Sequence, residues 1–158
     1  MALTMSGEVQ INAPREEVYK KLNDAETLKN SITGCETLEK LSDTELQATV
    51  TMKIGPVKAR WKGKVTLSDL DPPNGYKITG EGEGGVAGFA KGGAAVHLSD
   101  KDGGTLLKYD VDAQIGGKLA QLGQRLIAGA AKKMADDFFN KFAAAVGAPA
   151  PVVNQQAG

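Results

Sequence analysis

The stretch Val57-Lys-Ala-Arg-Trp-Lys-Gly-Lys-Val-Thr-Leu-Ser68 decides the fold class of this chain. Apolar or small side chains occupy every second position, and cationic or hydroxyl side chains occupy the positions between them. This period of two is typical of a β-strand that covers one face and leaves the other in water. Such a strand usually belongs to an antiparallel sheet, so the sequence predicts a sheet of this kind.

Six other segments show a strand pattern. Residues 46–54 alternate before the Gly55-Pro56 turn, and residues 76–83 alternate after the loop at residues 71–75. Gly, Pro, Asn and Asp favour tight turns, so these two junctions are expected to connect neighbouring strands. Four further strands are predicted at residues 8–11, 38–41, 94–98 and 105–115.

Helical patterns interrupt the strands near the start and follow them at the end. Pro14 suits the first position of a short helix, and Asp24 caps a second short helix that ends at Gly34. Residues 118–146 carry a wide apolar stripe, and about 29 residues at 1.5 Å each span roughly 43 Å, enough to cross the sheet. The stripe includes Leu119, Leu122, Leu126, Ile127, Met134, Phe138, Phe139 and Phe142.

These patterns predict an α+β fold. We expect residues 1–146 to form one domain, in which a seven-stranded curved antiparallel sheet wraps around a long C-terminal helix. Two short helices are expected after the first strand. Residues 147–158, rich in Pro and Ala, are expected to be a disordered tail.

Composition argues against several classes of protein. Lys and Arg number 19 and Asp and Glu also number 19, so no net positive charge attracts a nucleic acid. The lone cysteine, Cys35, cannot form an internal disulfide, which fits a reducing compartment. The sequence shows no secretory signal and no run of roughly 18 apolar residues that would span a bilayer. We expect a cytoplasmic protein, and any place at the inner face of the membrane is expected to be peripheral.

The inward positions of the predicted sheet carry small side chains. Gly reaches 20 residues, whereas Phe, Trp and Tyr together make 5% of the chain. A curled sheet resists collapse onto a helix, so we expect an apolar cavity, for which about 300–1,000 Å³ is typical. Tight helix–sheet packing is the alternative. The small positions are Ala48, Ala59, Gly63, Gly80, Gly82 and Ala113 on strands, and Gly123, Ala130 and Ala131 on the predicted helix.

The two-residue repeat of a strand and the 3.6-residue repeat of a helix indicate which side chains face inward, and these are the residues that we expect to line the cavity. They are Met52, Trp61, Gly63, Ile78, Gly80, Leu122 and Leu126, with Phe89 in a Gly-rich loop placed to gate the entrance.

Signals for catalysis or cofactor binding are weak, and no metal or cofactor is expected. Gly80-Glu-Gly-Glu-Gly-Gly85 matches G-x-G-x-x-G, but a dinucleotide site needs a helix directly after the motif, and two carboxylates inside it repel phosphates. His97 is the only histidine and is expected to face outward, so neither a hydrolytic pair nor a zinc site is supported.

Charged side chains alternate on the outward face of the predicted sheet. We expect a basic ladder to pair across strands with acidic pairs, and a docking patch for a protein partner is the alternative. The ladder is Lys58, Arg60, Lys62 and Lys64, and the acidic pairs are Glu81 with Glu83 and Asp110 with Asp112.

Three blocks of the sequence resemble the carbon monoxide dehydrogenase G-subunit family. They are Gly55-Pro-Val-Lys58, Asp71-Pro-Pro73 and Gly116-Gly-Lys-Leu-Ala-Gln-Leu-Gly123, and the resemblance runs from about Ser6 to Val146. This family lies within the START- and birch-pollen-allergen-like helix-grip folds. The resemblance implies a seven-stranded sheet that grips a C-terminal helix over an apolar cavity.

The same resemblance implies a function. It implies a non-catalytic accessory protein that binds a quinone- or lipid-like ligand and helps recruit a CO dehydrogenase-type molybdenum hydroxylase to the membrane. Some members extend past the helix to an apolar anchor, whereas this chain ends at Gly158, so we expect transient membrane contact without a transmembrane anchor. A polyketide cyclase or aromatase is the competing expectation, but inward acid–base groups are limited to Tyr76 and Tyr109. A structural domain with a filled core is the third.

Overall fold

Seven strands form one antiparallel sheet in the computed structural model, which describes residues 1–146. The sheet order is β1-β7-β6-β5-β4-β3-β2, so the first strand pairs with the last and the others pair with their sequence neighbours. The predicted tail at 147–158 lies outside the described residues. The strands are β1 (Ala2–Ile11), β2 (Cys35–Lys40), β3 (Glu45–Ile54), β4 (Val57–Asp71), β5 (Gly75–Glu83), β6 (Phe89–Lys101) and β7 (Gly104–Gly116).

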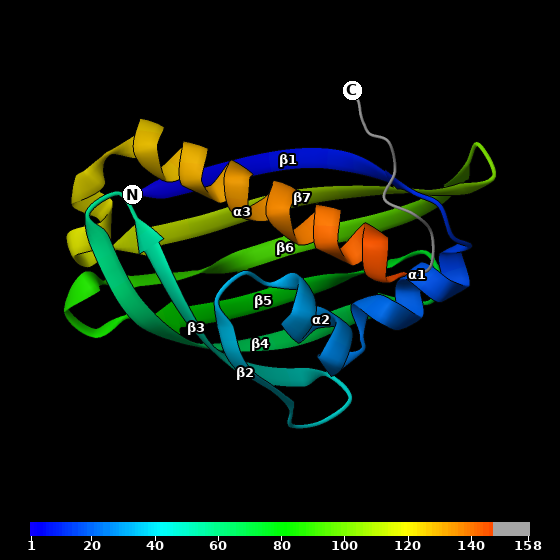
Figure 1. The fold of residues 1–158 in the computed structure, drawn as a ribbon, viewed down its shortest axis with the longest axis horizontal. Coiled ribbons are helices and arrows are strands. Elements are labelled where there is room, and N and C mark those ends of the chain that lie inside the picture. Colours follow the sequence, from blue (N-terminus) through cyan, green and yellow to red (C-terminus); the bar gives the residue numbers. More distant parts are fainter. Residues whose placement is uncertain (147–158) are drawn as a thin grey trace.

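Helices cover one face of this sheet. The long helix α3 (Gln124–Ala145) runs across it, the short helix α1 (Arg15–Leu22) lies at one end, and the short helix α2 (Ala25–Ser31) packs against α3 and β2 (Figure 1). The Asp24 carboxylate accepts a hydrogen bond from the Thr27 amide at 3.0 Å and thereby caps α2. The predicted helix-grip architecture is therefore confirmed. No helix within residues 1–146 is long and apolar enough to cross a membrane.

The C-terminal helix begins later than the sequence pattern predicts. Residues predicted as its first turns instead form a 3₁₀ helix, η2 (Gly117–Leu122), and α3 starts at Gln124. Gly123, predicted within the helix, has a φ of +93° and lies in front of it. This left-handed conformation is open to glycine at little cost and breaks a right-handed helix.

Strands β1 and β6 begin five or more residues earlier than predicted. β1 extends back to Ala2 through Gly7, where a Cβ atom would lie 2.5 Å from the Tyr109 hydroxyl. Glycine is needed there because the tyrosine ring occupies the space of its side chain. β6 begins at Phe89 after a short 3₁₀ helix, η1 (Gly85–Ala87), so Phe89 belongs to a strand and not to a Gly-rich loop.

Buried apolar side chains gather in two clusters. The α1 core includes Ile11, Val18, Leu22, Leu46, Leu67, Tyr76, Val96, Leu98, Leu107 and Phe142. The η2 core includes Leu3, Ile54, Val57, Trp61, Ala87, Ile115, Leu119 and Ile127. Leu3 and Ile11 lie eight residues apart on β1, which at about 3.3 Å per residue separates the cores by roughly 26 Å.

Candidate functional site

The interior between the two cores is the candidate ligand site. Inward-facing residues of the central strands are only half-buried there, although the sheet face they occupy is covered by helices. They are Val50, Gly63, Gly80, Gly82, Ala94, Val111 and Ala113. In a close-packed interior these positions would be fully buried, so their partial exposure indicates open space above the middle of the sheet.

The contacts that an added Cβ atom would make at Gly63 and Gly82 show how much room lies above these strands. A Cβ atom at Gly63 would lie 3.4 Å from the Glu81 carbonyl oxygen and 3.9 Å from the Cα of Gly82. A Cβ atom at Gly82 would lie 3.7 Å from the Lys62 carbonyl oxygen. Both contacts are to backbone of the adjacent strand, and no described atom of α3 comes within 4 Å of either position. The helix therefore does not press onto the sheet at these positions.

The placement of α3 explains why the space stays open. The helix lies closest to α2 and β1, so it crosses the sheet nearer β1 than β4 and β5 (Figure 1). Ile127 fixes its start in the η2 core and Phe142 fixes its end in the α1 core. In the turn after Ile127 the half-buried side chains include Ala130 and Ala131, which are too small to reach the central strands. Phe138 and Phe139, nearer the end of the helix, pack against the α1 core instead.

The structure groups some of the predicted lining residues and separates others. Trp61 is buried in the η2 core, and Met52 and Leu122 pack half-buried against that core. Ile78 packs against the α1 core, and Gly63 and Gly80 lie on the central strands between the two cores.

Phe89 and Leu126, in contrast, are exposed at the molecular surface. Phe89 lies against the backbone of Gly116, and Leu126 lies against the Gly55 turn. Parity alone places Leu126 inside, but α3 turns this side chain toward the end of the molecule.

Burial keeps the two inward tyrosines in their protonated form. Burial raises the pKa of Tyr76, whose ring meets Tyr19 edge-on at 5.7 Å between centroids. Burial also raises the pKa of Tyr109, and nearby Asp136 raises it further. Both phenols therefore stay protonated at neutral pH and cannot act as bases there. His97 is exposed, as predicted.

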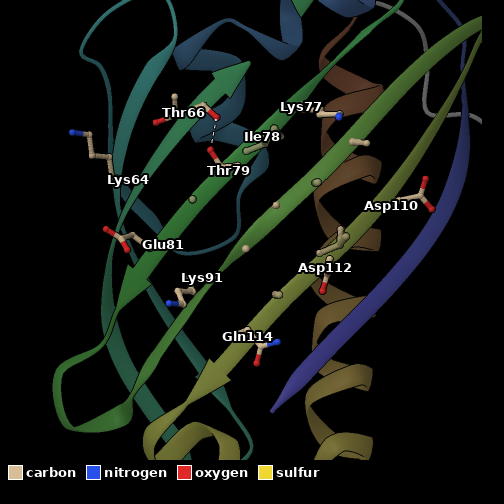
Figure 2. Close-up of a pocket in the computed structure, with 17 residues that line it drawn as sticks. Lys64, Thr66, Lys77, Ile78, Thr79, Glu81, Lys91, Asp110, Asp112 and Gln114 are labelled. Atoms are coloured by element: carbon tan, nitrogen blue, oxygen red, sulfur yellow. Dashed lines mark hydrogen bonds between the residues drawn. The ribbon is translucent and has the colours of Figure 1, made fainter. Parts of the chain in front are cut away.

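A second candidate site, which the sequence pattern does not predict, is an open groove of about 950 Å³ on the outward face of the sheet. Its floor on β6 is formed by Gly93 and Ala95, and longer side chains on β5 and β7 form its sides. Figure 2 shows Lys64, Glu81, Lys91, Asp110 and Asp112 around it. The sequence feature that could have predicted this groove is the small size of the residues at outward positions of β6.

The charges around this groove pair differently from the prediction. The register sets Lys64 opposite Glu81, but the Lys64 ammonium lies 3.5 Å from Glu45 on the other side. Arg60 pairs with Glu36 at 2.7 Å. Within residues 1–146, Asp110 and Asp112 form no ion pair, because their β6 neighbours are Ala95 and Gly93. The predicted cross-strand pairing is therefore wrong for these carboxylates.

Residues 7–147 match the family of the carbon monoxide dehydrogenase G subunit, CoxG. The chain belongs to the CoxG family. A conserved protein from Geobacillus kaustophilus is 34% identical, with a TM-score of 0.86 over 91% of this chain and 95% of that chain. No curated protein gives a significant match. Membership of a family named for one component of an enzyme supports an accessory, ligand-binding role in general terms.

More distant structures share the fold of this CoxG-family chain. A START superfamily protein from Mycobacterium smegmatis has a TM-score of 0.69 at 14% identity, covering 90% of this chain and 96% of that chain. The di-domain aromatase/cyclase BexL has a TM-score of 0.61 at 10% identity, covering 97% of this chain and 51% of that chain. At these identities the likeness establishes the fold alone.

Proposed function

We propose that this CoxG-family chain is a non-catalytic carrier whose interior binds an apolar, quinone- or lipid-like molecule. It acts beside a CO dehydrogenase-type molybdenum hydroxylase and helps bring that enzyme to the membrane. The observation that carries the proposal is the open interior at Gly63 and Gly82, where no described atom of α3 fills the space. The proposed lining is Met52, Trp61, Gly63, Ile78, Gly80 and Leu122, with the exposed Phe89 and Leu126 at the entrance.

Native mass spectrometry tests this proposal. The purified chain is incubated with a prenylated naphthoquinone in mild detergent, and the expected spectrum shows one quinone per chain. A chain that stays bare at micromolar quinone would contradict a carrier role. Turnover of an added polyketide would instead favour a cyclase.

We propose the outward groove as the surface for the hydroxylase. The free carboxylates of Asp110 and Asp112 suit a basic patch on that partner, because unpaired surface charges steer association. Replacing both with lysine should weaken binding of the hydroxylase about tenfold at low salt and leave quinone uptake unchanged. Biolayer interferometry measures this, with Glu26→Lys on α2 as the control. Equal binding by the double variant and the parent would place the interface elsewhere.

We propose the end formed by η1, η2 and the Gly55-Pro56 turn as the membrane-contacting surface (Figure 1). Val86 in η1 is 94% exposed, and Phe89 and Leu126 are also exposed. Single exposed apolar side chains are common, but here three share one end of the molecule with cations. These cations are the exposed side chains of Lys53, Lys58, Lys118 and Arg125. Apolar side chains surrounded by cations suit an anionic bilayer surface.

Val86→Asp should reduce vesicle binding several-fold, because an anionic side chain would replace the most exposed apolar group on that surface. Co-sedimentation with phosphatidylglycerol-containing vesicles measures the bound fraction. Leu41→Asp is the control, since Leu41 is also an exposed apolar residue, at 47%, but lies in the β2–β3 turn. If both variants reduce binding equally, no particular end of the molecule contacts the membrane.

A further inference from the structure

The indole nitrogen of Trp61 is a buried donor without an acceptor. Trp61 is 8% exposed, and its Nε1 atom is inaccessible and has no hydrogen-bond partner among the described residues. Buried polar groups in folded proteins are almost always hydrogen-bonded, so an exception calls for a physical explanation. The buried residues that cluster with Trp61 are apolar, so the core around the indole offers this donor a hydrocarbon environment.

A lone water molecule is a poor partner for this donor. Buried waters are held by two to four polar groups, and an apolar cavity of this kind stays dry. The side chains around Trp61 are aliphatic, including Ile54, Val57, Leu119 and Ile127. A water at Nε1 would gain one hydrogen bond and lose its others. The surroundings instead suit an acceptor atom attached to an apolar molecule.

The position of Trp61 connects this donor to the open interior. Trp61 and Gly63 lie two residues apart on the same face of β4, a separation of about 6.6 Å along the strand. A Cβ atom at Gly84 would lie 2.8 Å from Cε3 and Cζ3 of the indole, so the backbone just before η1 covers the ring edge opposite the one that carries Nε1. The half-buried Met52 packs against the same core, and its flexible thioether chain can move aside for a ligand.

We infer that Trp61 is the specificity-determining hydrogen-bond donor of this site, and that the ligand is an apolar molecule with an oxygen acceptor, of the carbonyl class, at one end. The acceptor lies against Nε1, and the hydrocarbon part extends over Gly63 and Gly82. This inference rests on the proposed carrier function, because it requires that the interior be occupied.

Two probes of nearly the same shape separate the donor from simple apolar uptake. Menadione is a naphthoquinone with two carbonyl groups, and methylnaphthalene is its hydrocarbon skeleton. Trp61→Phe removes the N–H group and keeps an aromatic ring. We expect this variant to bind menadione about five- to tenfold more weakly than the parent, and methylnaphthalene within about twofold of the parent. Leu122→Ala, which shortens an apolar side chain packed against the same core, should instead change both affinities by the same factor.

The single tryptophan also allows a direct readout in the parent protein. Menadione should shift the one indole N–H proton resonance downfield, whereas methylnaphthalene should leave the N–H without an acceptor. If the parent binds both probes and Trp61→Phe changes neither affinity, or both equally, the inference is overturned and the carrier function stands. If the parent binds neither probe, the carrier function fails as well.

Discussion

Replacing Phe142 with alanine is expected to lower the free energy of unfolding by about 3–5 kcal/mol. The Phe142 side chain is fully buried in the α1 core, where it packs among residues from β1, α1 and β7. Its ring also stacks on Phe138, with 5.7 Å between ring centroids. Strands of the sheet hold the surrounding side chains, so the cavity would collapse only in part and the variant would lose both burial and contacts.

Urea denaturation followed by circular dichroism measures this loss. Met134→Ala is the matched control, because Met134 lies on the same helix but is 45% exposed, and its truncation should change stability by less than about 1 kcal/mol. A Phe142→Ala variant as stable as that control would show that the C-terminal end of α3 is not held in the core. The binding site should survive the Phe142 substitution in the folded fraction, because Phe142 lies in the α1 core and Trp61 in the η2 core.

This separation suggests how the molecule combines stability with an open interior. Each end of α3 is held in a packed core, Ile127 at one end and Phe142 at the other. After Ile127 the helix carries the small side chains of Ala130 and Ala131, and no described atom of α3 comes within 4 Å of a Cβ atom at Gly63 or Gly82. The two packed cores at the ends of α3 supply the stability, so the interior between them can stay open for a ligand.

The order of elements could be predicted from the sequence because most strands have a clear period of two. The errors have identifiable causes. Gly7 interrupts the apolar alternation of β1, and Gly92 and Gly93 interrupt that of β6, so the pattern predicts both strands shorter than they are. The predicted helix start is too early because Leu119, Leu122 and Leu126 keep a helical spacing across the break at Gly123.

The interior site was more predictable than the outer groove. Parity places Gly63 and Gly82 on the covered face, and their lack of side chains follows from the sequence alone. Whether Leu126 faces inward depends on how α3 is rotated about its axis, which no local pattern reveals. The ion pairs depend on rotamers and on bulges, such as the irregularity between Cys35 and Thr37 that accompanies the pairing of Glu36 with Arg60. Sequence alternation contains no such information.

Replacing Gly63 with leucine is expected to abolish uptake of the apolar ligand, with affinity reduced by about a hundredfold or more. The leucine side chain would project into the space that the ligand requires. The side chain and the ligand could not both fit there. The fold should tolerate the change. Gly63 does not adopt a left-handed conformation, and its Cβ would make ordinary contacts of 3.4 Å and 3.9 Å. Gly80 is a poorer choice, because a Cβ there would lie 3.0 Å from the Lys64 carbonyl oxygen.

Native mass spectrometry with the prenylated naphthoquinone measures the bound fraction of the Gly63→Leu variant, and thermal unfolding verifies that it is folded. Thr66→Leu is the matched control, because Thr66 lies on the same strand but on the opposite, exposed face. The control should bind the quinone as the parent does, since its added methyl groups lie in water. Quinone uptake by a folded Gly63→Leu variant at the parental level would mean that the ligand binds outside the space between α3 and the central strands. The small inward residues would then serve helix–sheet packing, which is the alternative account of the glycines.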